Sequence, residues 1–253
     1  MMWVLWLYMF VNGMHSLVSV ARGFASPAEP PPSRVSIVVC CYSEPDRYVE
    51  VSLRSLAEQD AVSMYPESFE LIFATSGGCS EGIARRYGFS VLRTPRGKLV
   101  SRHIATLRAS GDIVVSADAD TFYPPSWLSE VLKPFRDPSV VAVSAPSVEG
   151  SPQVLRELVA GIPKHLIYIS KMSGRASAFR RWAYIAIGGF NTDADRVYME
   201  TGDTSVLVSE EEENLRKRLE KLGRIAYVNT PAIHLGKPHG RGLHAGIQKA
   251  FFG

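Results

Sequence analysis

The chain has 253 residues, of which 46% are hydrophobic and 21% are charged, so it can form a full core and is neither disordered nor collagen-like as a whole. Its 28 Lys and Arg and 25 Asp and Glu give a formal net charge of +3 without a basic block, which argues against a nucleic-acid partner. Three cysteines are too few for a disulfide framework. Cys40 and Cys41 are adjacent in an apolar run, where we expect buried thiols of a reducing compartment.

The amino-terminal segment carries no charged residue over positions 1–20 and is largely apolar. Twenty helical residues span about 30 Å, the thickness of a bilayer core. We therefore expect a membrane anchor at residues 1–22, with a cleaved signal peptide or an interfacial helix as alternatives. Positive residues follow this segment and none precedes it, which predicts a single-pass protein with the body of the chain on the cytoplasmic side. Residues 23–34 are rich in proline and predict an extended linker.

The apolar pattern beyond the linker alternates between strand-like and helix-like segments. Helices are expected at residues 46–59, 81–87, 100–109 and 127–135. Strands are expected at residues 35–41, around 69–73, and at 89–92, 113–117 and 140–145, with a last strand and its exit over 227–233. Strands that alternate with helices pair in parallel. We predict an α/β fold with a Rossmann-like, mostly parallel sheet and helices on both faces. The domain would span residues 35–235, and residues 236–253 would form a tail or a lid.

Ligands of such sheets bind at the carboxyl ends of the strands. That rule brings Tyr42, Ser76, Asp118 and Asp120 around one crevice. An aromatic ring can line a nucleobase, and two carboxylates can bridge a hard divalent cation to substrate phosphates. Asp-x-Asp is a common sequence, however, and the same carboxylates could instead cap the next helix.

Several motifs in a fixed order make this interpretation more specific. They are Val35-Ser-Ile-Val-Val-Cys-Cys-Tyr42-Ser-Glu44-Pro, Gly97-Lys98, Ala109-Ser110-Gly111-Asp112, Asp118-Ala119-Asp120, Gly174-Arg-Ala-Ser-Ala-Phe-Arg180-Arg181, Gly188-Gly189-Phe190, and Glu211-Glu212-Glu213-Asn214-Leu215-Arg216-Lys217-Arg218-Leu219 with Gly223 beyond. In this order they resemble the family 2 glycosyltransferases of the GT-A fold. The resemblance covers about residues 35–235.

The resemblance implies an inverting enzyme that moves a sugar from a nucleoside-diphosphate sugar and depends on a divalent cation, Mn²⁺ or Mg²⁺. It implies that Asp120 holds the cation against the diphosphate, and that Asp118 contacts the ribose or the metal. In some enzymes of this fold a late histidine completes the metal shell. His234 is the candidate here, and a surface histidine is the alternative.

The donor contacts implied by the resemblance are Cys40, Tyr42, Glu44, Ser76, Lys98, Arg102 and Asp118. Three of these have structural alternatives, because Lys98 and Arg102 could be solvated residues of a helix face and Cys40 a plain core residue. Many family members carry two aspartates where this chain has Ala74-Thr75-Ser76-Gly77-Gly78. The nucleotide is therefore not predicted, and uracil is not assumed.

Inversion requires a general base opposite the leaving group. The register of the last motif places Glu212 where the family has an aspartate base, and Glu211 is the alternative. A third interpretation is structural, because Ser209 and Glu212 fit a capping box that begins a helix. In that helix Glu212 would pair with Arg216, and Glu213 with Lys217.

The acceptor side is less specific. Gly174 and Arg175 are candidates for the acceptor path and Trp182 for an acceptor contact, although a tryptophan at an apolar helix start is more often a core residue. The expected acceptor is a lipid-linked sugar, a polyprenyl phosphate or a glycan at the membrane, and this expectation rests on the predicted anchor.

Two alternative functions remain. One is a nucleotidyltransferase, although the usual Gly-rich basic loop after the first strand is missing. The other is a non-catalytic module that binds sugar nucleotides or glycans.

Overall fold

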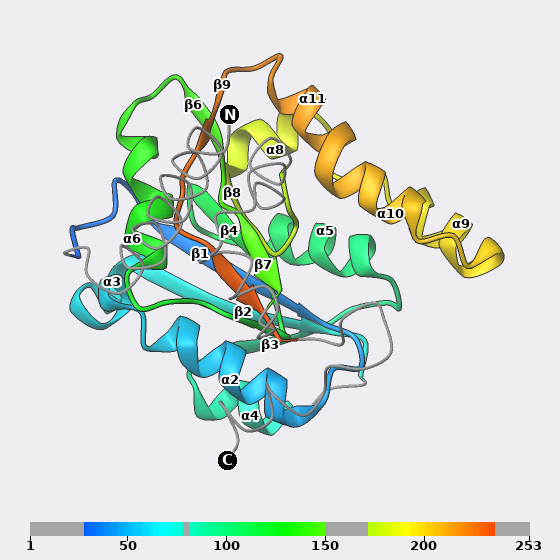
Figure 1. The fold of residues 1–253 in the computed structure, drawn as a ribbon, viewed down its shortest axis with the longest axis horizontal. Helices are drawn as coiled ribbons and strands as arrows, with labels where there is room; N and C mark the ends of the chain where they lie inside the picture. The colour runs from blue at the N-terminus through cyan, green and yellow to red at the C-terminus, as the bar shows by residue number, and fades with distance from the viewer. Residues whose placement is uncertain (1–27, 78–80, 150–171, 236–253) are drawn as a thin grey trace, which may run out of the picture.

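A computed structural model of the chain describes residues 28–77, 81–149 and 172–235, and its central feature is a seven-stranded sheet (Figure 1). The sheet has the order β3-β2-β1-β4-β8-β6-β9, and β8 runs antiparallel to both of its neighbours while the remaining pairs are parallel. The prediction of a mostly parallel α/β sheet is confirmed. The strands are β1 (Val35–Cys41), β2 (Phe69–Thr75), β3 (Ser90–Arg93), β4 (Ile113–Asp118), β6 (Val140–Ser144), β8 (Ala176–Arg180) and β9 (Arg224–Tyr227).

The central strand β1 explains why the sheet is covered on both faces. All seven of its residues are buried, as expected of an apolar run with layers above and below it. Ile37 and Val39 pack with one group of helices, α2 (Asp46–Ala57), α3 (Asp60–Met64), α4 (Glu81–Arg86) and α6 (Trp127–Leu132). Val38 and Cys40 pack with the other, α5 (Lys98–Arg108), α8 (Arg181–Ala186), α10 (Ser205–Ser209) and α11 (Leu215–Leu219). The predicted helices on both faces are therefore confirmed.

The carboxyl ends of three strands meet at one edge of the sheet. In the register of β1, Cys41 lies beside Thr75 of β2, and Cys40 lies beside Asp118 of β4. The two cysteines differ in their chemistry. Cys40 is free and buried, as predicted, whereas Cys41 is disulfide-bonded, which corrects the expectation of two thiols.

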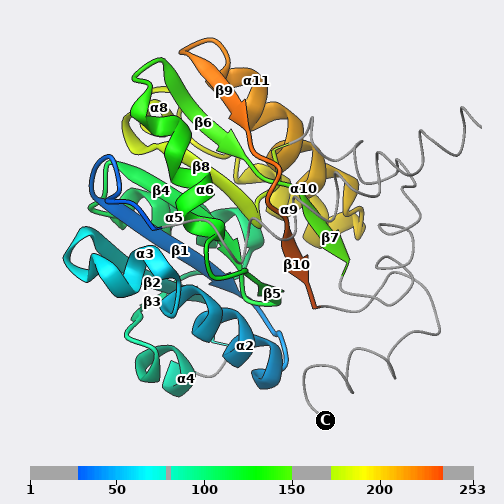
Figure 2. The same cartoon turned by 60° about the vertical axis from the view of Figure 1, so that its left-hand side comes forward.

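A second, three-stranded sheet brings the late part of the chain to this edge (Figure 2). Its central strand β10 (Ala232–His234) pairs antiparallel with β5 (Thr121–Phe122) and parallel with β7 (Ser147–Glu149). The sequence predicted one strand and its exit over residues 227–233, whereas the structure has two strands there, with β9 ending at Tyr227 and β10 beginning at Ala232. The separation allows β9 to extend the main sheet while β10 joins the second one.

Two of the predicted helices end earlier in the structure than the sequence indicated. The helix expected at residues 46–59 ends at Ala57, because Gln59 has extended backbone (φ −58°, ψ 139°), and the separate helix α3 begins at Asp60. The helix expected at residues 127–135 continues after α6 as a short 3-10 turn, η2 (Lys133–Arg136). Pro134 lies in that turn and cannot donate the backbone hydrogen bond of an α-helix. Another 3-10 turn, η1 (Pro66–Ser68), precedes β2.

The acidic segment forms the middle of a longer helix. α10 passes directly into a π-helical turn, η4 (Glu210–Asn214), and then into α11. Ser209 has helical backbone and makes no side-chain cap, so the predicted capping box is wrong. Lys217 pairs with Glu213 at 2.6 Å as predicted, whereas Arg216 pairs with Glu220. π-helical turns within α-helices are frequent at functional sites.

Two predicted regions lie outside the described residues, namely the anchor at residues 1–22 and the tail at residues 236–253. The described part of the predicted linker, residues 28–34, contains no helix or strand. A search of the described part of the chain found no helix with the length and apolarity that a bilayer crossing requires.

Candidate functional site

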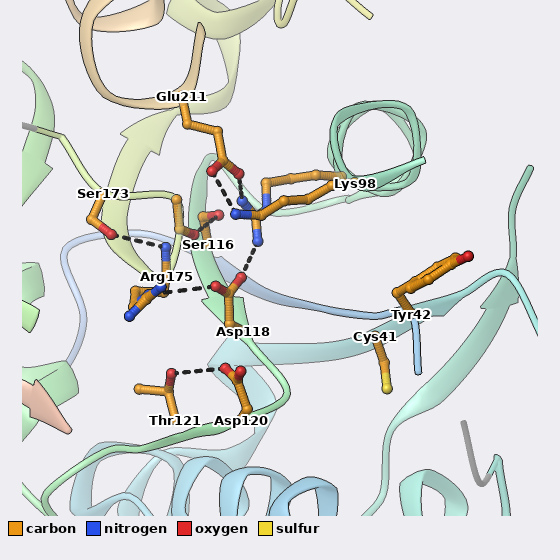
Figure 3. A network of polar contacts seen from close by, with 12 residues as sticks. Cys41, Tyr42, Lys98, Ser116, Asp118, Asp120, Thr121, Ser173, Arg175 and Glu211 are labelled. Atoms are coloured by element: carbon orange, nitrogen blue, oxygen red, sulfur yellow. Dashed lines mark hydrogen bonds and ion pairs between the residues drawn. The ribbon is translucent and has the colours of Figure 1, made fainter. Parts of the chain in front are cut away.

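Charged side chains from three elements converge beside the carboxyl end of β4 (Figure 3). Asp118 is the last residue of β4, Lys98 and Arg102 lie on the first turns of α5, and Glu211 lies on η4. Lys98 and Arg102 are four residues apart, so they share one face of α5. The structure thus brings together four of the residues that the sequence analysis selected.

Arg102 is the centre of this cluster and is fully buried. Its Nη2 donates to Oδ1 of Asp118, and its Nη1 donates to Oε1 of Glu211. The second oxygen of Glu211 accepts a hydrogen bond of 2.6 Å from Nζ of Lys98. Burial disfavours the charged guanidinium, but Asp118 and Glu211 outweigh it and raise the pKa of Arg102. A buried charge of this kind is stable only when it is paired.

Asp118 is surrounded by cations. Burial alone would raise its pKa, but Arg102, then Lys98 and Arg175, hold the pKa of Asp118 well below its usual range. Nε of Arg175 lies 3.6 Å from the second carboxylate oxygen. The Asp118 carboxylate is therefore ionised throughout the physiological range, as a ligand for a cation must be, and can accept a hydrogen bond from a ribose hydroxyl.

Tyr123 supports the backbone of this cluster and was missed by the sequence analysis. Its hydroxyl accepts a hydrogen bond of 3.0 Å from the amide of Asp118 and donates one of 2.8 Å to the carbonyl of Arg175. Burial raises the pKa of Tyr123, so the hydroxyl keeps its proton. The available signal was an aromatic residue three positions after Asp120, which by itself is too common to select.

Gly174 has no side chain, so its backbone can lie in contact with the ion pair of Arg102 and Glu211. A Cβ atom at this position would lie 2.5 Å from Oε1 of Glu211 and would also meet Nη1 of Arg102. The carbonyl of Gly174 accepts a hydrogen bond of 2.5 Å from Ser116 of β4, which fixes the segment in place. Gly174 and Arg175, selected for the acceptor path, therefore lie in the cluster.

Asp120 faces a histidine from the second sheet. Nε2 of His234 lies 3.0 Å from Oδ2 of Asp120, because β10 pairs with β5 and places His234 opposite Thr121. The amide of Leu235 also donates to the carbonyl of Asp120 at 2.7 Å. Within residues 28–77, 81–149 and 172–235, no group of three or more His, Cys, Asp and Glu side chains has the arrangement of a metal site. The candidate ligands for a cation at this position are therefore one carboxylate, Asp120, and one imidazole, His234.

The expected nucleotide contacts lie beside the end of β1. Tyr42 is 41% exposed, and the Arg96 guanidinium lies 5.1 Å from the centre of its ring. Oε2 of Glu44 accepts hydrogen bonds from the amides of Tyr42 (2.7 Å) and Ser43 (3.0 Å), so Glu44 fixes the turn that presents the ring. Burial, with a smaller contribution from Asp120, raises the pKa of Glu44. Ser76 is partly buried and follows the last residue of β2.

Cys40 lies behind the cluster. Burial raises the pKa of its thiol to about 11, so the thiol is neutral and packs as a small apolar group. This environment supports the alternative of a plain core cysteine.

One predicted residue, Trp182, is not brought into the cluster. Trp182 is 53% exposed on α8, and the amide of its neighbour Arg181 donates to the carbonyl of Asp112, at the amino end of β4. Trp182 therefore lies at the other end of the strand from Asp118. Glu212 is partly buried, and its carbonyl accepts a hydrogen bond of 3.4 Å from the amide of Met172. Glu211, the residue before it, is the one whose carboxylate binds Lys98 and Arg102.

The fold is shared with solved glycosyltransferase structures. The structure of mannosyltransferase PcManGT from Pyrobaculum calidifontis, in complex with GDP-Man and Mn²⁺, matches with a TM-score of 0.61 and 21% identity over 92% of this chain and 68% of that one. Glucosyl-3-phosphoglycerate synthase from Mycobacterium tuberculosis, in complex with Mn²⁺, UDP and glucosyl-3-phosphoglycerate, matches with a TM-score of 0.54 and 19% identity over 82% of this chain and 74% of that one. GalNAc-T7 with UDP, GalNAc and Mn²⁺ matches with a TM-score of 0.60 and 14% identity over 82% of this chain and 45% of that one. None of the curated proteins matches the chain.

The family is shown by a direct match of the sequence. The family model for "Glycosyl transferase family 2" matches residues 36–169, which is more than half of the chain and includes the Asp118–Asp120 motif. The resemblance inferred from the motifs is thereby confirmed. This chain belongs to glycosyl transferase family 2.

Proposed function

We propose that this chain transfers a sugar, with inversion, from a nucleoside-diphosphate sugar to an acceptor, with the help of a divalent cation. The observation that carries the proposal is the pair of Asp120 and His234, 3.0 Å apart and next to the buried Asp118–Arg102–Glu211 cluster. A carboxylate and an imidazole from different parts of the chain meet at the sheet edge where ligands of this fold class bind.

We propose that the divalent cation is Mn²⁺ or Mg²⁺, held by Asp120 with His234. These cations take oxygen ligands, with imidazole suited to the softer transition metals, and often keep several waters and substrate phosphate oxygens in their shell. Two protein ligands are therefore sufficient. When bound, the cation would neutralise charge on the departing diphosphate. The three solved relatives described above contain Mn²⁺, which supports this assignment.

We propose that the donor lies along the edge from Tyr42 to Arg175. The exposed ring of Tyr42, with Arg96 over it, is suited to stack against a nucleobase. Lys98 and Arg175 provide positive charge on the side of the diphosphate. Burial opposes the charge of Lys98, but Glu211 and Asp118 outweigh it and raise its pKa, so its ammonium stays charged at physiological pH.

We propose Glu212 as the general base and Glu211 as its anchor. Both oxygens of Glu211 already accept hydrogen bonds from Lys98 and Arg102, so neither is left to bind the hydroxyl of an acceptor. Glu212 is the next residue of the same turn and occupies the base position in the motif register. If the acceptor is a phosphate, its oxygen is already anionic and needs no base.

We further propose that the acceptor is a lipid-linked sugar, a polyprenyl phosphate or a glycan at the cytoplasmic face of a membrane. This proposal rests on the uncharged apolar sequence of residues 1–20. Addition of vesicles containing polyprenyl phosphate to the assay tests it, because transfer to a water-soluble glycan alone would contradict it.

The test of the main proposal is a panel of nucleoside-diphosphate sugars, each with and without Mn²⁺. Binding of a cognate donor raises the melting temperature by mass action, and slow release of the sugar should then follow. Release of pyrophosphate from a nucleoside triphosphate would instead identify a nucleotidyltransferase. Metal-dependent binding without any turnover, with every acceptor offered, would identify a binding module.

A further inference from the structure

Asp195, on helix α9 (Asp193–Thr201), is a buried carboxylate outside the cluster described above. Its side chain belongs to a residue that is only 3% exposed. Oδ1 accepts a hydrogen bond of 2.9 Å from the amide of Lys98, and Oδ2 accepts one of 2.7 Å from the amide of Val100. These amides belong to the first turn of α5, whose free N–H groups need acceptors. Asp195 thus caps α5 from a distant part of the chain.

Helix α5 cannot provide this cap from its own sequence. The residue before it is Gly97, which has no side chain and a φ of +144° that other residues rarely adopt. A Cβ atom on Gly97 would lie 2.7 Å from Oδ2 of Asp195. The carboxylate of Asp195 can therefore reach the first turn of α5 only because Gly97 has no side chain.

The cap acts on the helix that carries two cations of the cluster. The amide that Asp195 binds is that of Lys98 itself, and the ammonium of Lys98 reaches Glu211 at 2.6 Å. Glu211 follows α9 and α10 in the chain (Figure 1). The segment from Asp195 to Glu211 therefore contacts α5 twice, at the backbone amides of its first turn and at the ammonium of Lys98. A third contact closes this segment, because the amide of Asn191 donates to Oε1 of Glu210 at 2.8 Å. The start of α5 and the acidic turn are thus held by the same stretch of chain.

We propose that Asp195 is a positioning residue of the glycosyl transfer reaction. It fixes the first turn of α5, and thereby the direction in which Lys98 extends toward Glu211 and the donor diphosphate. A carboxylate also interacts favourably with the positive end of an eleven-residue helix. This inference rests on the proposed function, since its effect on turnover requires that the site transfers a sugar.

The test compares Asp195→Ala with Asp195→Asn and with Asp193→Ala, a control at an exposed acidic residue of the same helix. Loss of the cap should lower kcat/KM by about tenfold to a hundredfold, the range expected of a small displacement of a positioned group. Asparagine keeps one acceptor oxygen and is a good helix cap, so Asp195→Asn should recover part of the loss. Asp193→Ala should equal the wild type.

A double variant separates positioning from general damage to the fold. If Asp195 acts through Lys98, then Asp195→Ala combined with Lys98→Met should be no slower than Lys98→Met alone. Losses that multiply, or a wild-type kcat/KM in Asp195→Ala, would overturn the inference.

Hydrogen exchange tests the cap without reference to activity. The amides of Lys98 and Val100 should exchange faster in Asp195→Ala, and at the wild-type rate in Asp193→Ala. Unchanged protection in Asp195→Ala would refute the cap. Absence of transfer by the wild type with every donor would refute the proposed function instead, and the exchange result would still decide whether Asp195 holds α5.

Discussion

Arg102 and Glu211 form a buried ion pair across 109 positions of the chain. The same guanidinium binds Asp118 at the end of β4. Arg102 therefore connects the strand that ends at the proposed metal-binding motif with the helix that carries the proposed base. Removal of the guanidinium would leave Asp118 with Arg175 and Glu211 with Lys98, each short of one charged partner at a buried position, which is more costly than loss of an exposed pair.

Replacement of Arg102 should consequently damage both stability and transfer. Arg102→Met is expected to lower the free energy of unfolding by about 3–5 kcal/mol. Arg102→Lys keeps the charge but lacks the planar fork that reaches two carboxylates, so it should be intermediate. Denaturant unfolding and initial transfer rates provide the measurements. Arg108→Met, at an exposed arginine of the same helix, is the control, and an equal effect of the two methionine variants would contradict the assignment.

Gly174→Ala should reduce transfer because the added methyl group would press on Glu211 and Arg102. Gly188→Ala is the comparison variant, since a Cβ atom there meets nothing within 4 Å and its cost is that of a side chain in left-handed backbone (φ +78°). We expect Gly174→Ala to lose transfer well beyond the loss in Gly188→Ala, while circular dichroism shows both variants folded. Similar rates in the two variants would mean that the Gly174 segment can move away without consequence.

Five strands of the main sheet, β1, β2, β3, β4 and β6, were predictable from local apolar patterns, whereas β8 and β9 were not predicted. Val35–Cys41 is apolar throughout, and a strand buried on both faces requires that pattern. The convergence of Tyr42, Asp118 and Asp120 followed from the rule that ligands bind at the carboxyl ends of parallel strands. His234 was selected only through the resemblance to a family, and its contact with Asp120 depends on the pairing of β10 with β5.

The remaining features depend on contacts that the local sequence does not encode. Ser209 and the glutamates after it match a helix start, yet the structure continues the helix through them because α10 already precedes that position. Asp195 has no local signal at all, because its partners are amides almost a hundred positions away. Trp182 was selected for its residue type, whereas its position at the amino end of β4 is set by the hydrogen bond of Arg181 to Asp112.

Loss of the proposed cation ligands should remove the metal dependence of donor binding. Asp120→Ala is expected to abolish the increase in melting temperature that Mn²⁺ with a cognate donor produces, and His234→Ala to reduce it. The readout is thermal unfolding with metal alone, donor alone and both together. His103→Ala is the control for loss of a partly buried histidine elsewhere. An undiminished metal-dependent shift in Asp120→Ala would place the cation at other residues.

The two neighbouring glutamates should differ in what their replacement changes. Glu212→Gln is expected to leave donor binding intact and to slow transfer to a hydroxyl acceptor severely, because an amide cannot accept the proton. Glu211→Gln removes a charge from the pairs with Lys98 and Arg102, so it should also lower stability. Single-turnover transfer and denaturant unfolding separate these effects. Full transfer by Glu212→Gln would indicate that Glu211 is the base or that the acceptor is a phosphate.

Glu70 provides a pH-dependent test of the fold away from the site. Its carboxylate accepts hydrogen bonds from the amide and hydroxyl of Ser110 and from the hydroxyl of Ser36. Burial alone would raise its pKa, but these bonds outweigh it and lower the pKa of Glu70 below 4.5. The folded state therefore binds this proton more weakly than the unfolded state.

The stabilisation from Glu70 should accordingly be fully present above the unfolded pKa of 4.5 and be lost as the pH falls through the lower folded value. We expect the difference in free energy of unfolding between the wild type and Glu70→Gln to be constant from neutral pH to about pH 5 and to shrink below that. Denaturant titrations at a series of pH values measure it, with Glu58→Gln, at an exposed glutamate, as the control for removal of a charge. A difference that grows on acidification would reverse the sign of the shift and contradict the assigned hydrogen bonds.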